Sequence, residues 1–199
     1  MVQGCNLRFT SVESTKAQKN TSVQTRILLL PNGFRQDCVN FLIKCERVLR
    51  AKKGFEVSIK LHPALDGSFL KSFCKKIGLT VERWITNTSV QDAFNEADVI
   101  LTSTATVSYL EGLSAGIPTY RVGVSNWIDL NACWEKKNWN RVYYSAAELE
   151  EMLTNPTANA IEQMAVAQEI KAAYFEPIST EKMKNMIESS RFKAKNKDL

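Results

Sequence analysis

Residues 98–118 read Asp-Val-Ile-Leu-Thr-Ser-Thr-Ala-Thr-Val-Ser-Tyr-Leu-Glu-Gly-Leu-Ser-Ala-Gly-Ile-Pro. The apolar run at 98–102 predicts a buried strand, and the residues after it predict a helix that opens at Thr104 or Ala105 and ends at Gly116. The Ile-Pro that follows starts another β-rich run. A strand, a helix and a strand in direct succession are typical of a parallel sheet, because parallel neighbours need a crossover connection.

The same alternation runs along most of the chain. Short β-rich runs predict the other strands at 26–30, 55–61, 79–85, 117–122 and 141–144. Helical spacing predicts the other helices at 36–52, 66–77, 89–96, 147–153, 158–173 and 180–192. Asp66, Ser89 and Ser145 are placed to cap helices, and Gly78 to end one. The sequence predicts an α/β fold with a doubly wound, mostly parallel, Rossmann-like sheet of about six strands and C-terminal helices.

The two ends of the chain differ in character from its middle. Residues 1–24 are polar and show no sustained hydrophobic period, which is typical of a linker or leader. We expect residues 25–199 to form one domain. The net charge of +5 gathers in part near the C-terminus, between Lys182 and Lys197. Such a run is usually a solvated face or tail, with contact to an anionic membrane surface as the alternative. Its one aromatic residue is Phe192, which is too few for a stacking platform, so no nucleic acid is expected.

Composition bounds the class of protein. The 199 residues are 44% hydrophobic and 24% charged, which is an ordinary globular balance. No run is long enough to span a membrane and the N-terminus lacks a secretory pattern, so we expect a cytoplasmic chain, or one at the inner face of the membrane. The five cysteines are widely spaced without a C-x-x-C pair, and we expect reduced thiols. No acidic pair has metal-ligand spacing, so we expect neither a metal nor a cofactor.

Ligands of doubly wound sheets bind outside the carboxyl ends of the strands. The candidate loops are therefore 31–35, 62–66, 86–89 and 102–106. In the first loop, Gly33 allows a positive φ and a close approach of backbone N–H groups to an anion, and Arg35 offers a guanidinium to a phosphate. The alternative is a plain Asn-Gly turn with a surface arginine.

His62 is the single histidine and stands at the end of a predicted strand, before a proline. A lone histidine is often structural, but this position faces the ligand crevice. No nucleophile or metal partner is evident for it, which favours hydrogen bonding to a phosphate or carbonyl over nucleophilic catalysis.

Ser103, Thr104 and Thr106 place hydroxyl groups between a strand and a helix. With the free N–H groups of a first helical turn, they predict an anion cradle, although the same residues would also serve as caps. Glu111 lies further along that helix, where its carboxylate could accept hydrogen bonds from a ribose diol. The alternative is a solvated helix glutamate.

Four motifs in a fixed order resemble the C-terminal half of GT-B glycosyltransferases. They are Leu-Pro-Asn-Gly-Phe-Arg at 30–35, Lys-Leu-His-Pro at 60–63, Ala-Asp-Val-Ile-Leu-Thr-Ser-Thr-Ala-Thr-Val at 97–107 and Glu-Gly-Leu-Ser-Ala-Gly-Ile-Pro at 111–118. The His-Pro pair and Ser/Thr cluster are similar to bacterial enzymes of surface-polysaccharide assembly. The first loop is closer to the lipid-A disaccharide synthase type. The resemblance covers about residues 25–153.

The resemblance implies metal-independent sugar transfer from a nucleotide-sugar donor. It implies that phosphate and ribose lie near seven positions of this chain: Gly33, Arg35, His62, Ser103, Thr104, Thr106 and Glu111. A GT-B enzyme also needs an acceptor-binding half, which these residues do not supply. We therefore expect either an excised half or a donor-binding subunit with a partner chain, binding donor with little turnover. The alternatives are a nucleotide-sugar epimerase-type domain and a non-enzymatic α/β interaction module.

Overall fold

The computed structural model describes residues 24–51, 54–104, 106–123, 142–154 and 165–170, with Glu181 and Lys184. The predicted leader at 1–24 lies outside them except for Gln24, as does most of the basic C-terminal run. The strands are β1 (Thr25–Leu30), β2 (Phe55–Lys60), β3 (Arg83–Ile85), β4 (Val99–Ser103), β5 (Thr119–Val122) and β6 (Val142–Tyr143). The helices are α1 (Arg35–Ala51), α2 (Gly67–Ile77), α3 (Val90–Phe94), α4 (Ser108–Ser114) and α5 (Ala146–Thr154).

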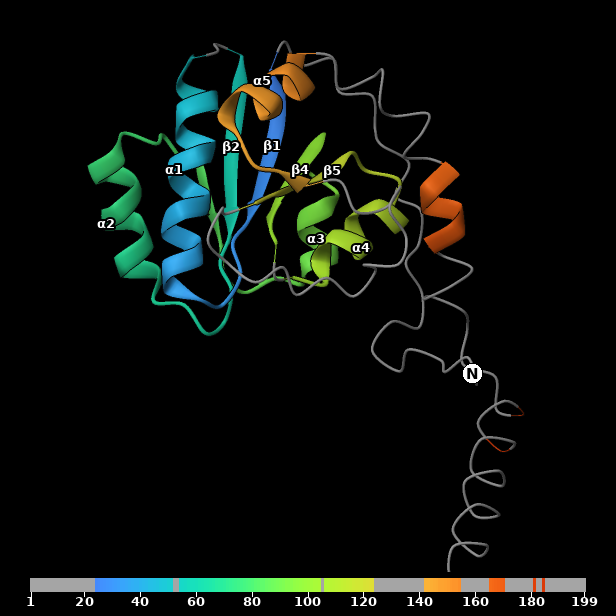
Figure 1. Cartoon of the computed structure of the whole chain (residues 1–199). Coiled ribbons are helices and arrows are strands. Elements are labelled where there is room, and N and C mark those ends of the chain that lie inside the picture. Colours follow the sequence, from blue (N-terminus) through green and yellow to red (C-terminus); the bar gives the residue numbers. More distant parts are fainter. Residues whose placement is uncertain are drawn as a thin grey trace, which may run out of the picture.

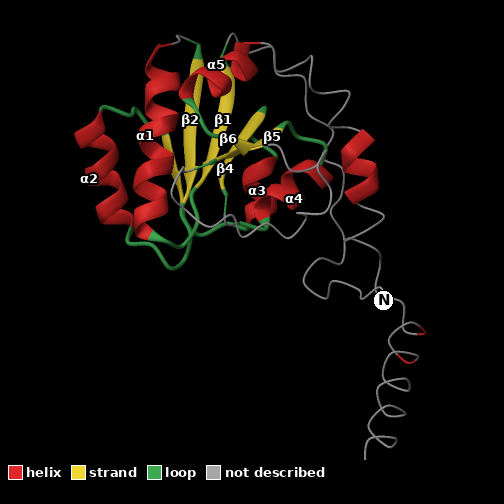
Figure 2. Ribbon diagram, in the orientation of Figure 1, coloured by secondary structure: helices red, strands yellow, loops and turns green. Residues whose placement is uncertain are grey.

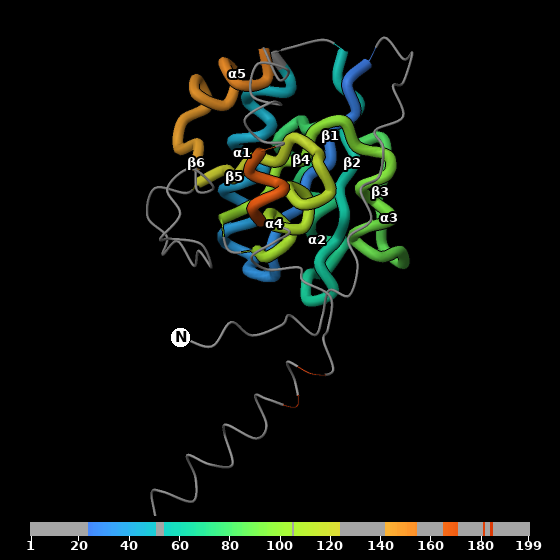
Figure 3. The backbone as a smooth tube through the Cα atoms, turned by 90° about the vertical axis from the view of Figure 1, so that its right-hand side faces the viewer, coloured from blue at the N-terminus to red at the C-terminus, as the bar shows by residue number. Residues whose placement is uncertain are grey.

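The six strands form one sheet in the order β3-β2-β1-β4-β5-β6, and all neighbours are parallel. β3 and β6 lie at opposite edges (Figure 3). The chain moves from β1 to one side through β2 and β3, and then returns to the other side of β1 through β4. The predicted doubly wound, Rossmann-like fold is confirmed, with the reversal between β1 and β4.

Side chains of the central strand alternate between two apolar layers. Ile27 and Leu29 pack into the larger cluster, which includes buried residues of α1, α2 and α5. Leu28 and Leu30 belong to a second cluster, together with residues of α3. Figures 1 and 2 show α1 and α2 on one side of the sheet and α3 and α4 on the other. This burial on both faces explains why β1 reads as a continuous apolar run.

Local signals set several helix boundaries as predicted. The Asp66 carboxylate accepts a hydrogen bond from the Ser68 N–H, and Gly78 ends α2 with a φ of 83°. Ser89 and Asp92 form a reciprocal capping box at the start of α3. The thiols of Cys38 and Cys45 are buried on one face of α1, which agrees with a packing role.

Two predicted boundaries are wrong by three or four residues. β3 begins at Arg83 rather than at residue 79, because the Leu79 N–H donates to the Cys74 carbonyl and still belongs to the end of α2. α4 begins at Ser108 rather than at Thr104 or Ala105. The Thr106 hydroxyl accepts a hydrogen bond of 3.3 Å from the Ser108 N–H, which holds this entry in a side-chain turn.

An ion pair joins the amino ends of β1 and β4. The Arg26 guanidinium donates to both carboxylate oxygens of Asp98, at 2.7 and 3.1 Å, and the Arg26 backbone N–H donates to the same group at 2.9 Å. Burial acts to raise the pKa of Asp98, but these three hydrogen bonds outweigh it and hold the pKa below its usual range. The pair therefore fixes the two central strands at the edge away from the candidate loops.

Among the described residues, no helix has the length and apolar character needed to cross a bilayer.

Candidate functional site

The loops after β1, β2 and β4 meet at the carboxyl edge of the sheet. β1 lies between the other two strands and pairs with both. The segments that leave these strands therefore start side by side, and they carry most of the predicted site residues. The loop after β3 is linked to β2 as well, because the Lys60 ammonium of β2 donates a hydrogen bond of 3.1 Å to the Thr86 carbonyl.

Gly33 and His62 bring the first two loops into contact. A Cβ atom placed on Gly33 would lie 3.0 Å from both Cε1 and Nδ1 of the His62 ring. Positive φ angles occur at Gly54, Gly78 and Gly116 and not at Gly33, so the expected left-handed conformation at Gly33 is wrong. The position instead requires a small residue because the imidazole occupies the space of a side chain.

The orientation of the His62 ring is set by its own loop. Its Nδ1 atom accepts a hydrogen bond of 3.1 Å from the Ala64 N–H, and the Leu65 N–H donates to the His62 carbonyl at 2.9 Å. An Nδ1 atom that accepts leaves the hydrogen of a neutral imidazole on Nε2. The His62 side chain is exposed, so this Nε2–H is available to donate to an anionic ligand.

Asn32 joins the first loop to β4. Its backbone N–H donates to the Ser103 hydroxyl oxygen at 3.0 Å, and its side-chain oxygen accepts from the Phe34 N–H at 2.9 Å. Its amide nitrogen donates to the carboxylate of Asp37, in the first turn of α1. Asn32, Asp37 and Ser103 are all buried. Sequence reasoning missed Asn32 and Asp37, although a polar residue two positions after a buried strand was a signal for the first.

The hydroxyl cluster is more enclosed than expected. Ser103 and Thr104 are buried and Thr106 is half-buried. The Ser103 oxygen accepts from Asn32, and the Thr106 oxygen accepts from Ser108. The Thr106 hydroxyl thus orders the turn before α4, whose N-cap residue is Val107 without a side-chain cap. A contact of these hydroxyls with a ligand stays a prediction.

A buried arginine supports the segment that follows β4. Arg121 in β5 is 1% exposed, and its guanidinium donates to the Thr104 carbonyl at 2.9 Å. The same group lies over the Tyr109 ring, 5.4 Å from its centre. Glu111 is buried on α4, so its description as a solvated helix glutamate is wrong. Its contact with a ribose stays a prediction.

Arg35 makes a different contact from the one expected. Its guanidinium carbon lies 3.8 Å from the centre of the Phe69 ring of α2, which stacks in turn on Phe73. The side chain is exposed, so the edge of the guanidinium keeps N–H donors available above the ring. The structure thus places Arg35 beside the second loop, and its phosphate contact stays a prediction.

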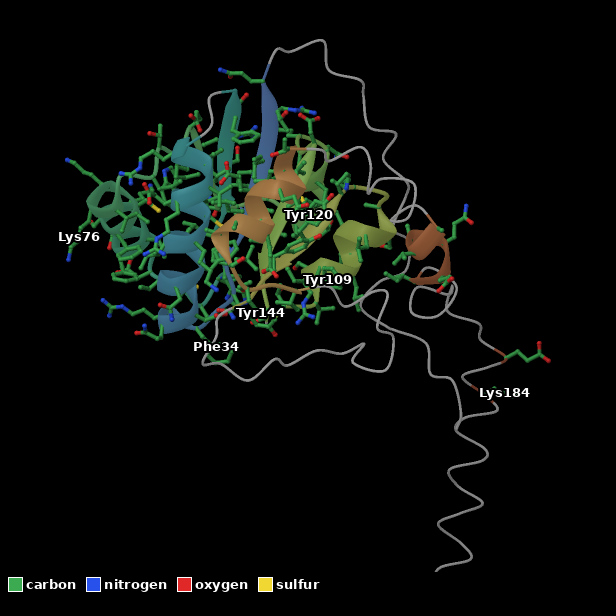
Figure 4. The ribbon with its side chains drawn as sticks, turned by 45° about the horizontal axis from the view of Figure 1, so that its top comes forward. Phe34, Lys76, Tyr109, Tyr120, Tyr144 and Lys184 are labelled. Carbon is green, nitrogen blue, oxygen red and sulfur yellow. The ribbon has the colours of Figure 1, made fainter. Side chains whose placement is uncertain are left out.

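Exposed apolar residues gather on the same edge. In the described part of the chain, the large exposed hydrophobic residues are Phe34 (52%), Val107 (44%) and Tyr144 (49%). They follow β1, β4 and β6, and we call them the apolar rim. Figure 4 labels Phe34 and Tyr144 along one edge of the domain, with Lys76 on α2 away from them. A rim of this kind beside polar loops is typical of a surface that meets a ligand or partner.

Two open cavities of the described residues lie away from this edge. These shallow cavities, of about 230 and 410 Å³, share Gly78, Leu79 and Thr80, near the amino end of β3. The candidate site at the carboxyl edge is defined here by the contacts between its loops. In the described residues, no three His, Cys, Asp or Glu side chains are grouped to hold a metal ion.

Replacing Gly33 by alanine tests the contact with His62. We expect the new methyl group to displace the imidazole and to lower the free energy of unfolding by about 1 kcal/mol. In a His62→Ala background the same change should be neutral or stabilising, because alanine fits the backbone conformation and restricts the unfolded chain. A double-mutant cycle by urea denaturation measures the difference. Equal effects in both backgrounds would contradict the contact.

Comparisons by sequence give no assignment. The sequence matches no protein-family model. It matches no curated protein either.

Comparisons by structure do find similar proteins. The glycosyltransferase SnogD from Streptomyces nogalater has a TM-score of 0.57 at 14% identity, and the match covers 85% of this chain and 44% of SnogD. WaaG, a glycosyltransferase involved in lipopolysaccharide biosynthesis, gives 0.51 at 16% identity over 86% of this chain and 50% of WaaG. A Listeria monocytogenes protein described as a UDP-N-acetylglucosamine 2-epimerase gives 0.52 at 13% identity, over 82% and 46%.

The likeness assigns a class of fold. The chain matches the C-terminal domains of GT-B glycosyltransferases, as the four sequence motifs predicted, and it matches a domain of the epimerase equally well. Identities this low show the fold alone. The chain spans half or less of the length of these three proteins.

Proposed function

We propose that this chain binds the nucleotide-sugar donor of a glycosyltransferase, with the phosphates at the loops after β1, β2 and β4. The observation that carries the proposal is the joining of these loops at the strand-order reversal. Gly33 packs against His62, and Asn32 is bonded to Ser103. Doubly wound sheets bind their ligands at this reversal, and the fold is one that glycosyltransferases use.

The chain's own groups suggest how transfer proceeds without a metal. As the glycosidic bond to phosphate breaks, negative charge develops on the departing nucleotide. The Nε2–H of His62 is oriented by Ala64 to donate to it, and Arg35 above Phe69 adds a positive charge. The first N–H groups of the long helix α1 point to the same loops. Donors fixed before the reaction stabilise such charge without reorganisation. Glu111 is proposed for the ribose.

The acceptor half is proposed to pack on the apolar rim. Phe34, Val107 and Tyr144 are exposed around the proposed phosphate site, where an enzyme must bring the acceptor to the donor sugar. We assign residues 25–199 to one domain of such a two-part enzyme, whether the other part is joined or separate. The proposed setting is the cytoplasm or the inner face of a membrane, in polysaccharide biosynthesis, with no cofactor or nucleic acid bound.

A pair of substitutions at His62 tests the proposal. Asparagine places an oxygen where Nδ1 accepts from Ala64 but removes the outer donor, whereas glutamine places an N–H near the Nε2 position. We expect His62→Asn to weaken nucleotide binding about tenfold or more, because a hydrogen bond to a charged group is lost, and His62→Gln to retain most of it. Calorimetric titration with UDP, CDP, CMP and GDP measures this.

The control is Lys76→Ala on α2, an exposed change away from these loops. It should leave affinity unchanged. If the folded wild-type chain bound none of the four nucleotides, the proposed donor site would be wrong, and the non-enzymatic interaction module would replace it. Equal binding by His62→Asn and wild type would remove His62 from the site.

An epimerase-type domain is the second candidate, favoured by the likeness to the Listeria protein. Both candidates predict nucleotide binding at the same edge, so binding alone does not separate them. Incubating the chain with UDP-N-acetylglucosamine and following the sugar signals by NMR does. Appearance of an epimerised sugar would support the second candidate over the first.

A further inference from the structure

Asp37 is a buried carboxyl group directly beneath the proposed phosphate loops. It lies in the first turn of α1 and is 0% exposed. Its Oδ2 atom accepts from the Asn32 side chain, while its Oδ1 atom is buried and accepts no hydrogen bond from the described residues. An ionised carboxyl group in this position costs free energy of folding, because burial removes its hydrating water and no opposite charge compensates for it.

The surroundings of Asp37 contain few charges. No described ion pair includes it. Cys38 is next to it on α1, where burial raises the pKa of the thiol to about 12 and keeps it neutral. Arg35 stacks on the Phe69 ring and not on Asp37, and the exposed His62 ring lies against Gly33 of the first loop. The remaining neighbours are the uncharged Asn32 and the Ser103 hydroxyl of β4.

We propose that Asp37 is a positioning residue that ties the loop after β1 to the end of β4 through Asn32 and Ser103. Asp37 holds the Asn32 amide nitrogen, which leaves the Asn32 side-chain oxygen facing the Phe34 N–H. The Asn32 backbone N–H then meets the Ser103 hydroxyl, and the Cys38 thiol donates to the Asn32 carbonyl. One buried side chain thereby fixes two of the three loops that the proposed function assigns to the donor, those after β1 and β4.

Amide hydrogen exchange tests this without any ligand. In Asp37→Ala, we expect the Asn32 and Phe34 amides to exchange about tenfold faster or more, relative to amides of β2 and β5, since the side-chain bond that orders the loop is gone. Asp37→Asn keeps a side chain of the same shape and should stay within about threefold of wild type. Unchanged exchange at Asn32 and Phe34 in Asp37→Ala, or a uniform increase over all strands, would overturn the proposal. Asp37→Ser replaces the alanine variant if that does not fold.

Nucleotide binding provides the second readout, and this one rests on the proposed function. Asp37→Ala should weaken binding of the best of UDP, CDP, CMP and GDP about tenfold, while Asp37→Asn retains it. If wild type binds none of them, the proposed function fails, but the exchange rates still decide the role of Asp37. Retained binding in Asp37→Ala with fast loop exchange would overturn its part in the donor site.

A pH series tests whether the Asp37 carboxyl group is held in the buried setting described. Burial raises the pKa of Asp37, and the Asn32 and Ser103 side chains only partly oppose this rise. A raised folded-state pKa gives stability that is complete below the unfolded value of about 3.9 and is lost as the pH rises through the folded value. Relative to wild type, Asp37→Asn should therefore gain stability in urea as the pH is raised from acid to neutral. A constant difference across that range would show that Asp37 is not held as described.

Discussion

Replacing Arg121 by alanine is expected to lower the free energy of unfolding by about 3–5 kcal/mol, the sum of a cavity and an unsatisfied carbonyl. Arg121 is among the largest fully buried side chains of the domain. It donates to the Thr104 carbonyl at 2.9 Å and lies over the Tyr109 ring. Its loss would leave the start of the segment between β4 and α4 without its buried donor.

Arg121→Met is the matched control. Methionine restores most of the volume but cannot donate to Thr104, so its cost should be about 1–3 kcal/mol. Urea denaturation of the two variants separates the contribution of the side-chain volume from that of the hydrogen bond to Thr104. If both variants were as stable as wild type, the buried guanidinium would contribute nothing net, and the support of the Thr104 segment would have to come from another residue.

The second large effect is expected at Gly112, where α4 packs against β4 and β5. A Cβ atom there would lie 2.5 Å from Thr119 Oγ1 and 3.1 Å from Ile100 Cδ1. Alanine favours a helix over glycine by about 1 kcal/mol, but α4 would have to move away from β4 and β5. We expect Gly112→Ala to lower the free energy of unfolding by about 1–3 kcal/mol, as overpacking does.

A second substitution identifies the cause. Thr119→Ala removes both Thr119 atoms near the new methyl group, so it should restore much of the stability lost in Gly112→Ala. A coupling of about 1 kcal/mol or more in the double-mutant cycle supports the close approach. Additive effects would show that α4 has room at this position.

The fold was predictable because its signals are local. Alternating strand and helix patterns gave the order of elements, and short-range caps such as Asp66 and Ser89 gave boundaries that the structure confirms. The apolar run of β1 was predicted as a strand, and the structure buries it on both faces. These features depend on residues close together in the sequence, which is where pattern reasoning is strongest.

The site was predicted less completely because it depends on contacts between distant segments. Gly33 was selected for its backbone freedom, whereas its neighbour His62 is what requires a glycine there. Nothing in the sequence indicated that the Asn32 N–H would donate a hydrogen bond to Ser103 of the neighbouring strand β4. Nor did it indicate that Asp37 would be buried beneath these two residues. The late start of α4 is a separate case with a local cause, since a side-chain turn at Thr106 replaces the first helical turn.

The central claim is that the carboxyl edge of this sheet binds a nucleotide through its phosphates. The most direct test is an NMR titration of ¹⁵N-labelled protein with UDP, CDP, CMP and GDP, which locates binding residue by residue. We predict saturable shifts for one of them at the amides of Gly33, Ala64 and Thr104. No saturable shift with any of the four, or shifts confined to Gly78, Leu79 and Thr80 by the cavities near β3, would contradict the claim.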